Sequence, residues 1–236
     1  EKAIYYCKLA ANQNLPNAQY TLGCYFFNRE KNIPRDINKA IYYFTLAANQ
    51  NYPEAQYILG MIYYQRDIQK ALYYFSLASK QNHSKALFKL GEFYCFKKSN
   101  INKGIHYLTL SANQNNANAQ YLLGIMHYGN QFGILNYDKA KTYLLLASKQ
   151  NHPGAMIIIG IIEYLNKNMN KAIDYFYRLA LLGNISGCFY YGFLNHEGKF
   201  IEQNIYEAIK FYKNASCFYD QYSKNNLGII YKNGFS

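Results

Sequence analysis

Tryptophan is absent from these 236 residues, and proline occurs only four times. Acidic residues are also few: 13 Asp and Glu stand against 25 Lys and Arg, which gives a formal net charge of +12 at pH 7. Apolar residues are not lacking, because they make up half of the sequence, and this excludes a disordered chain. The composition therefore predicts a folded, basic protein whose aromatic share of 18% is almost all tyrosine and phenylalanine.

Long apolar runs are missing as well. The longest covers the eight residues 155–162, whereas a membrane helix needs about 20. The opening residues EKAIYY lack the apolar core of a secretory signal, and they start within the repeat described below. We therefore expect a piece of a longer protein without a membrane span. We expect it inside the cell, in the cytoplasm, with the lumen of the endoplasmic reticulum as the alternative.

Cysteines do not form regular pairs in this sequence. Their number is odd and no spacing recurs among Cys7, Cys24, Cys95, Cys188 and Cys217. A disulfide framework or a zinc site would show regular pairs. We therefore expect buried or half-buried free thiols in a reducing compartment, and neither a metal ion nor another cofactor.

What the sequence does contain is an internal repeat. A small residue is followed by a glycine 20 residues later, seven times in seven, whereas the distance from that glycine to the next small residue varies from 11 to 17. One connection within the repeat is thus fixed, and the other tolerates insertion as a surface loop does. The small residues are Ala3, Ala40, Ala71, Gly104, Ala140, Ala172 and Ala208, and the glycines are Gly23, Gly60, Gly91, Gly124, Gly160, Gly192 and Gly228.

Each period predicts two helices, which we call helix A and helix B. In the first full copy, helix A runs from about Asn17 to Asn28 and helix B from about Asp36 to Gln50, because apolar residues recur at spacings of three and four. The repeated glycine falls inside helix A. A glycine there costs about 1 kcal/mol relative to alanine, so its recurrence predicts close packing between helix A and helix B.

Residues suited to helix ends recur in register with the repeat. Asp or Asn precedes helix B, as an N-cap does, and Asn or Gly follows it, as the left-handed residue that closes a helix does. Pro16, Pro53 and Pro153 suit the first turn of the next helix A. The expected N-caps are Asp36, Asp67, Asn100, Asn136, Asn168 and Asn204, and the closing residues are Asn14, Asn51, Asn82, Asn115, Asn151 and Gly183, with Tyr219 as an exception.

The repeat resembles the Sel-one-like repeat family, a branch of the tetratricopeptide superfamily. The resemblance lies in AQYTLGCYFF, AQYILGMIYY and AQYLLGIMHY on helix A, and in DINKAIYYFTLAA, DIQKALYYFSLAS and NMNKAIDYFYRLA on helix B. The periods of 31 to 37 residues also differ from the constant 34 of ordinary tetratricopeptide repeats. The resemblance implies an all-α, right-handed superhelical α-solenoid of about seven helix–turn–helix repeats. It also implies an adaptor that binds proteins.

We expect residues 1–236 to form a single repeat array that begins and ends within a repeat. Such an array offers a concave groove, which helix A lines in the superfamily. Three helix A positions fall on one stripe: three residues before the glycine, one after it and four after it. The expected partner-binding residues on this stripe are Tyr20, Phe27, Tyr57, Tyr64, Tyr121, Tyr128, Tyr164, Phe193 and His196. The alternative is that the aromatic stripe is core packing, above all at the position three before the glycine.

A polar row interrupts the aromatic pattern three residues after the glycine. The fourth to sixth repeats carry His127, Glu163 and Asn195 there, where other repeats carry an aromatic residue. We expect the three side chains to line up across adjacent helices. They could form a ligand site, but one His and one Glu are few for zinc, and we favour a hydrogen-bonded row without a ligand.

Lysine recurs at the start of helix B, as Lys2, Lys39, Lys70, Lys103, Lys139 and Lys171. This row offers an alternative function, binding of nucleic acid or of an acidic protein or membrane surface. An enzyme that uses the polar row is a further alternative, but no nucleophile elbow, metalloprotease helix or phosphate-binding loop is present. We favour a non-catalytic scaffold whose partner is a protein or peptide, and we expect neither nucleic acid nor a small-molecule substrate.

Overall fold

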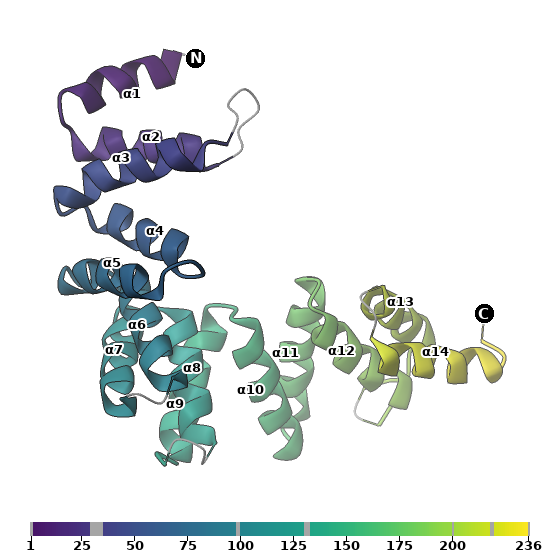
Figure 1. Ribbon diagram of the computed structural model, residues 1–236. Coiled ribbons are helices and arrows are strands. Elements are labelled where there is room, and N and C mark those ends of the chain that lie inside the picture. Colours follow the sequence, from purple (N-terminus) through teal and green to yellow (C-terminus); the bar gives the residue numbers. More distant parts are fainter. Residues whose placement is uncertain are drawn as a thin grey trace. The chain divides into compact units, whose positions relative to one another are not determined.

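The computed structural model describes residues 2–28, 35–97, 100–129, 133–199, 201–217 and 220–235. These residues form fourteen helices and no strand (Figure 1). This confirms the expected all-α fold of about seven helix–turn–helix repeats. The helices are α1 (Lys2–Asn12), α2 (Pro16–Phe27), α3 (Ile37–Asn49), α4 (Pro53–Tyr63), α5 (Ile68–Lys80), α6 (Ser84–Phe96), α7 (Ile101–Asn113), α8 (Ala117–Tyr128), α9 (Tyr137–Lys149), α10 (Pro153–Leu165), α11 (Met169–Leu181), α12 (Ile185–Glu197), α13 (Ile205–Ser216) and α14 (Gln221–Lys232).

The even-numbered helices are the expected helices A, and the odd-numbered helices are the helices B. Where helices of the described residues contact each other extensively, they are neighbours along the chain, such as α2 with α3 and α3 with α4. The chain divides into two compact units, Glu1–Ala119 and Gln120–Ser236, and the same hairpin recurs in both. No helix in the described ranges has the length and apolarity needed to cross a bilayer.

The expected helix ends are confirmed with one correction. Asn14, Asn51, Asn82, Asn115 and Asn151 adopt φ values of 58–63°, and Gly183 adopts 71°, so all six close a helix in the left-handed conformation. Five of the six expected N-caps accept a hydrogen bond from the backbone N–H three residues on. Asn168 is the exception, because its side chain donates to Glu163 Oε2 at 2.8 Å instead. Tyr219 lies outside the described residues.

Six of the seven helix A glycines are confirmed as packing residues, and Gly228 is the exception. A Cβ atom on Gly60 would lie 2.5 Å from the buried ring of Phe75, and one on Gly23 would lie 2.5 Å from Phe44. The next four glycines face a large helix B side chain at 2.7–3.0 Å, namely Leu108, Leu144, Phe176 and Tyr212. Each hairpin therefore fixes its helix A against one large side chain of its own helix B.

This packing predicts opposite effects for one substitution at two glycines. Gly60→Ala should lower the free energy of unfolding by about 1–3 kcal/mol, because the added methyl group overpacks the core. At Gly228 nothing lies within 4 Å of the added atom, so Gly228→Ala should stabilise α14 by up to about 1 kcal/mol through helix propensity. Urea denaturation followed by circular dichroism measures both; a loss of equal size at both positions would contradict the packing role.

A buried glutamine of helix A bonds to the end of its own helix B in three of the repeats. Gln56 is fully buried, and its Nε2 donates to the carbonyl of Ala48 in the preceding helix B at 3.1 Å. Its Oε1 accepts a hydrogen bond from Gln81 at 2.9 Å. Gln19 with Gln50 and Gln120 with Gln150 repeat the second contact at 2.8 Å. Gln56 and Gln19 also link their hairpin to the preceding helix B, because each donates to a carbonyl near the end of that helix, Ala48 at 3.1 Å and Ala11 at 3.5 Å.

The cysteines are free thiols, as expected, but their burial differs along the chain. Cys95 and Cys188 are buried, and Cys7 and Cys24 are half-buried. Burial raises the pKa of the Cys95 thiol to about 11, which keeps it protonated and unreactive near neutral pH. Cys217 is exposed, so the expectation that every thiol would be at least half-buried is wrong for this residue.

Candidate functional site

The tyrosines three residues before the glycine lie at the joint between two hairpins. The ring of Tyr20 lies 5.1 Å from that of Tyr52, and the ring of Tyr57 lies 5.0 Å from that of His83. Tyr121 stacks on His152 at 4.4 Å. All three tyrosines are half-buried, and burial raises the pKa of Tyr20 to about 12. At this position the aromatic stripe serves inter-hairpin packing, and only part of each ring is left for a partner.

The two histidines in these joints also begin a helix A. Nδ1 of His83 accepts the backbone N–H of Ala86 at 3.2 Å, and Nδ1 of His152 accepts that of Ala155 at 3.3 Å. Each imidazole therefore acts as an N-cap, which requires Nδ1 to be unprotonated. Burial lowers the pKa of both side chains; at His83 the nearby Glu54 opposes this and Lys85 adds to it.

The histidine caps predict a loss of stability in mild acid. The fold favours the neutral ring, so the stabilisation is complete above the unfolded pKa of about 6.5 and is lost as the pH falls below it through the lower folded pKa. The loss should be about 1 kcal/mol per cap. The double variant His83→Asn and His152→Asn keeps a capping oxygen and removes the titration. Thermal unfolding at several pH values should therefore show a flatter profile between neutral pH and pH 5; an unchanged profile would contradict this role.

The residues four after the glycine differ in exposure: Tyr128 is exposed, Phe27, Tyr64, Tyr164 and His196 are half-buried, and Cys95 is buried. Tyr128 is 46% exposed, and the edge of its ring meets Tyr137. Phe27 and Tyr64 each pack one side against a buried helix B ring, that of Phe44 and of Phe75. His196 meets the ring of Tyr212 edge-on at 6.1 Å. Tyr164 lines the cavity described next.

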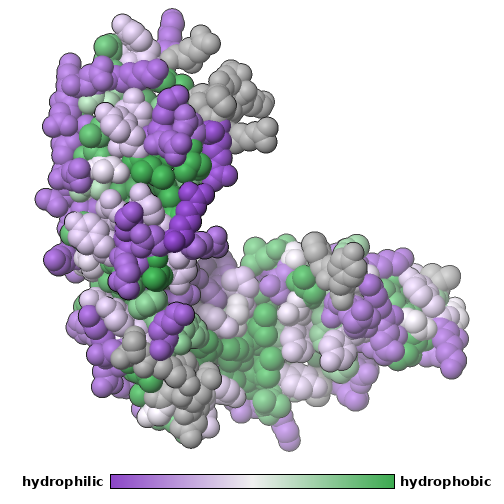
Figure 2. Space-filling model, in the orientation of Figure 1, coloured by the Kyte–Doolittle hydropathy of each residue, from purple (hydrophilic) through white to green (hydrophobic). Residues whose placement is uncertain are grey.

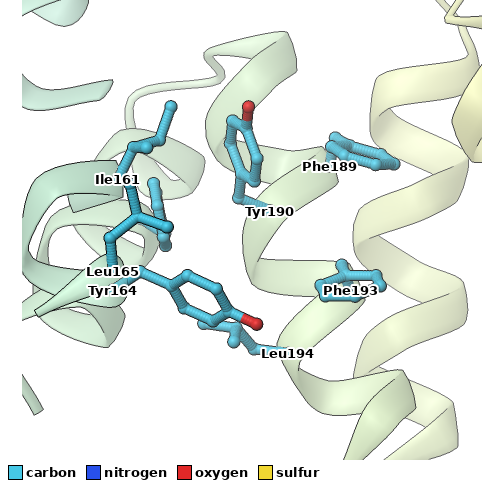
Figure 3. A pocket seen from close by; sticks show the side chains of 8 residues that line it. Ile161, Tyr164, Leu165, Phe189, Tyr190, Phe193 and Leu194 are labelled. Atoms are coloured by element: carbon cyan, nitrogen blue, oxygen red, sulfur yellow. The ribbon is translucent and has the colours of Figure 1, made fainter. Parts of the chain in front are cut away.

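A cavity of about 350 Å³ lies in the second unit between α10 and α12. Figure 3 shows its walls: Ile161, Tyr164 and Leu165 on one helix face Tyr190 and Phe193 on the next. Phe176 of α11 also lines it, stacked on Tyr190 with the ring centroids 4.7 Å apart. Phe189 and Leu194 complete the lining. The space-filling view also shows hydrophobic side chains gathered over α10 (Figure 2).

Two of the expected partner-binding residues, Tyr164 and Phe193, meet in this cavity. Ile161 and Phe189 belong to the same stripe of positions. The other lining residues, Leu165, Phe176, Tyr190 and Leu194, lie off the stripe and were not expected. Residues of two helices A, α10 and α12, enclose the cavity together with Phe176 of helix B α11. A pattern along a single helix cannot predict a cavity that three helices form.

The corresponding place in the first unit holds an ion pair. Lys89 Nζ lies 2.8 Å from Glu92 Oε2, and both side chains are largely buried. The ammonium group also lies over the rings of Tyr64 and Phe88, at 5.6 and 5.4 Å from their centroids. Lys89 and Glu92 stand two before and one after their glycine, as Tyr190 and Phe193 do in α12. The junction of α4 with α6 therefore differs in chemistry from that of α10 with α12 at the same positions of the repeat.

Each residue of the polar row makes its hydrogen bond within its own hairpin. His127 Nδ1 lies 2.8 Å from the carbonyl oxygen of Ile134, Glu163 accepts from Asn168, and Asn195 donates to the carbonyl of Tyr191. Glu163 and Asn195 are buried. Among the described residues, no group of three or more His, Cys, Asp or Glu side chains could hold a metal ion.

The position of the polar row normally carries a ring stacked on helix B. Phe26 stacks on Tyr43, Tyr63 on Tyr74 and Tyr94 on Tyr107, and His127 keeps this arrangement by stacking on Tyr143 at 6.0 Å. The helix B lysines cover the outer side of the same pairs. Lys39 lies over Phe26, Lys70 over Tyr63, and Lys103 over Tyr94 at 4.5 Å.

These lysines therefore have partners within the repeat. Lys39 and Lys70 also pair with the N-cap carboxylates of Asp36 and Asp67, at 3.1 and 3.6 Å. Lys39, Lys70 and Lys103 stabilise stacked rings through cation–π contacts, which are worth about 0.5–1 kcal/mol at exposed sites. At these three positions the lysine has a structural role within the repeat.

Comparison with protein families identifies the repeat. The Sel1 repeat model matches seven segments, residues 1–15, 16–52, 53–83, 84–116, 117–152, 159–184 and 185–217. The segment boundaries at 16, 53, 84, 117 and 185 coincide with the first residues of α2, α4, α6, α8 and α12. Comparison with curated proteins gives no match.

Solved structures share the fold at low sequence identity. A Sel1 repeat protein from Oxalobacter formigenes matches with a TM-score of 0.84 and 24% identity, over 96% of this chain and 68% of that one. A protective antigen of uropathogenic Escherichia coli with an SLR fold matches with a TM-score of 0.76 and 24% identity, over 99% of this chain. The present chain spans 52% of the length of that antigen. An immunity protein from Pseudomonas aeruginosa matches with a TM-score of 0.59 and 15% identity, over 88% of this chain and 82% of that one.

Proposed function

The chain belongs to the Sel1 repeat family, whose members are generally non-catalytic protein-interaction scaffolds, and we propose that it binds a partner protein through the surface formed by its helices A. The observation that carries the proposal is the apolar cavity between α10 and α12. It opens at the helix A positions that repeat along the chain, beside the half-buried Tyr164. An apolar hollow with few polar atoms is the form that a preformed binding site takes.

Solvent-exposed apolar side chains on helix A support the same surface. Leu165 is 69% exposed and Met61 is 39% exposed, although the core of each hairpin is filled by buried residues. Covering such side chains with a partner removes apolar area from water, and this is the main favourable term in most protein association. Helix B also carries exposed rings, such as Tyr42 and Tyr73, but a single ring on the surface needs no partner to explain it.

The proposal is tested by selecting ligands for the purified chain. A random-peptide library displayed on phage is panned against the immobilised protein, and the enriched peptides are synthesised and measured by calorimetry. We expect peptides whose binding depends on helix A residues of the stripe. Enrichment of no peptide, or of peptides displaced only by changes on the helices B, would contradict the proposed surface.

A further inference from the structure

The cavity between α10 and α12 has a size and chemistry that restrict what it can hold. Its eight lining side chains offer two polar atoms, the hydroxyl oxygens of Tyr164 and Tyr190. At about 350 Å³ it lies at the lower end of the range for ligand sites, roughly 300–1,000 Å³. An ionised group placed there would lose its hydration without gaining a counter-charge. The occupant must therefore be compact and apolar.

The cavity follows from the residues at the junction of α10 with α12. In the first unit the equivalent positions carry Lys89 and Glu92, whose ion pair lies against the neighbouring rings. In the second unit they carry Tyr190 and Phe193. Tyr190 stacks on Phe176 instead, and Phe193 stacks on Phe189 at 6.4 Å. Because both rings lie against their own supports, the space in front of them stays open.

The charge of the second unit indicates what should surround the apolar anchor. Residues 120–236 contain 11 Lys and Arg and seven Asp and Glu, a net charge of +4 within a chain of +12. Lys199 lies close enough to the lining residue Tyr164 to interact with it electrostatically, and it is 2.8 Å from Glu197. A positive surface attracts acidic segments and repels basic ones, which affects both the rate of association and the choice of partner.

We propose that the cavity between α10 and α12 receives one bulky apolar side chain, aromatic or branched aliphatic, from an acidic segment of a partner protein. This rests on the proposed function and names the chemistry of the partner. The apolar side chain supplies the contact area against the lining residues of α10, α11 and α12. Acidic residues on either side stay in water near the positively charged unit.

The test uses the random-peptide library and matched variants of the whole chain. Ile161→Trp fills the cavity from α10. Leu165→Gln removes an exposed apolar wall, and Leu181→Gln makes the same change at the end of α11, at a leucine that is 64% exposed and does not line the cavity. Circular dichroism establishes that each variant is folded. Since both leucines are exposed, folding of the Gln variants should not differ.

We expect enriched peptides to share one large apolar residue flanked by Asp or Glu. They should bind the wild type and Leu181→Gln equally, and bind Leu165→Gln and Ile161→Trp at least 10-fold more weakly. Peptides without a shared apolar residue, peptides with basic flanks, or equal losses at Leu165 and Leu181 would overturn the proposal. Self-association that Leu165→Gln abolishes in analytical ultracentrifugation would assign the cavity to a second copy and would also overturn it.

The outcomes separate this proposal from the function on which it rests. Peptides that bind all three variants like the wild type, but lose affinity when Tyr64 or Tyr128 is changed, would overturn the cavity assignment and leave the helix A surface standing. Enrichment of no peptide would overturn both. A peptide whose affinity falls only with Leu165→Gln and Ile161→Trp supports both.

Discussion

Replacing Tyr128 and Tyr164 together by alanine should weaken binding of a selected partner peptide by about 2 kcal/mol or more, which is typical of an interface hot spot. Both tyrosines stand four residues after their helix A glycine, on α8 and α10. Tyr128 is 46% exposed and Tyr164 lines the cavity, so both rings are available to a partner. A tyrosine gives a large contact area with little loss of rotamer freedom, and its hydroxyl can orient the partner. Calorimetry with wild type and variant measures the difference.

The control for this prediction is a pair of lysines on helix B. Lys70 and Lys103 lie over the rings of Tyr63 and Tyr94. Changing both to alanine should cost the fold about 1 kcal/mol per contact at most and leave peptide affinity nearly unchanged. If the lysine pair abolishes binding and the tyrosine pair does not, the binding surface lies on the helices B and the helix A assignment is wrong.

Phe75→Ala should be the most damaging single change to the fold. The ring is fully buried, lies against Gly60 and contacts the rings of Tyr57 and Tyr64. Its loss should lower the stability of the surrounding hairpins by about 3–5 kcal/mol. Because the main contacts of each helix are with its neighbours in the chain, the loss should stay local.

Hydrogen exchange distinguishes local from global loss. In the Phe75→Ala variant, exchange should accelerate in α4 and α5, while the amides of α11 to α13 keep their protection. A uniform loss of protection along the chain would contradict independent repeats.

Much of the fold was predictable because it depends on local chemistry that recurs. The Asn residues that close each helix B adopt positive φ values as expected, since Asn tolerates this conformation better than most residues. The helix A glycine faces a large helix B residue at a fixed distance along the chain. Such rules act within one hairpin, so they can be read from one period and checked against the others.

Features that depend on a contact between neighbouring helices were harder to predict. His83 and His152 cap a helix A where Asp or Asn would be usual. The sequence around His152 does not reveal that its ring also stacks on Tyr121. Asn168 stands where an N-cap belongs, yet it bonds Glu163, because that buried carboxylate replaces a stacked ring and needs a donor. Both cases depend on which side chain the neighbouring helix supplies.

The candidate site shows the same division. Tyr164 and Phe193 were expected on a shared stripe, and both line the cavity. The cavity itself depends on how Tyr190 and Phe176 stack, and no spacing along one helix reveals that. The sequence shows that Lys89 and Glu92 occupy the repeat positions that Tyr190 and Phe193 occupy in α12. It does not show that the first two form an ion pair.

Hydrogen exchange with and without a selected peptide shows whether a partner occupies the helix A surface at the α10–α12 cavity. We expect new protection in α10 and α12, around Tyr164 and Phe193, and little change in α11 and α13 beyond Phe176. Protection confined to the helices B, or spread evenly over both units, would contradict this expectation.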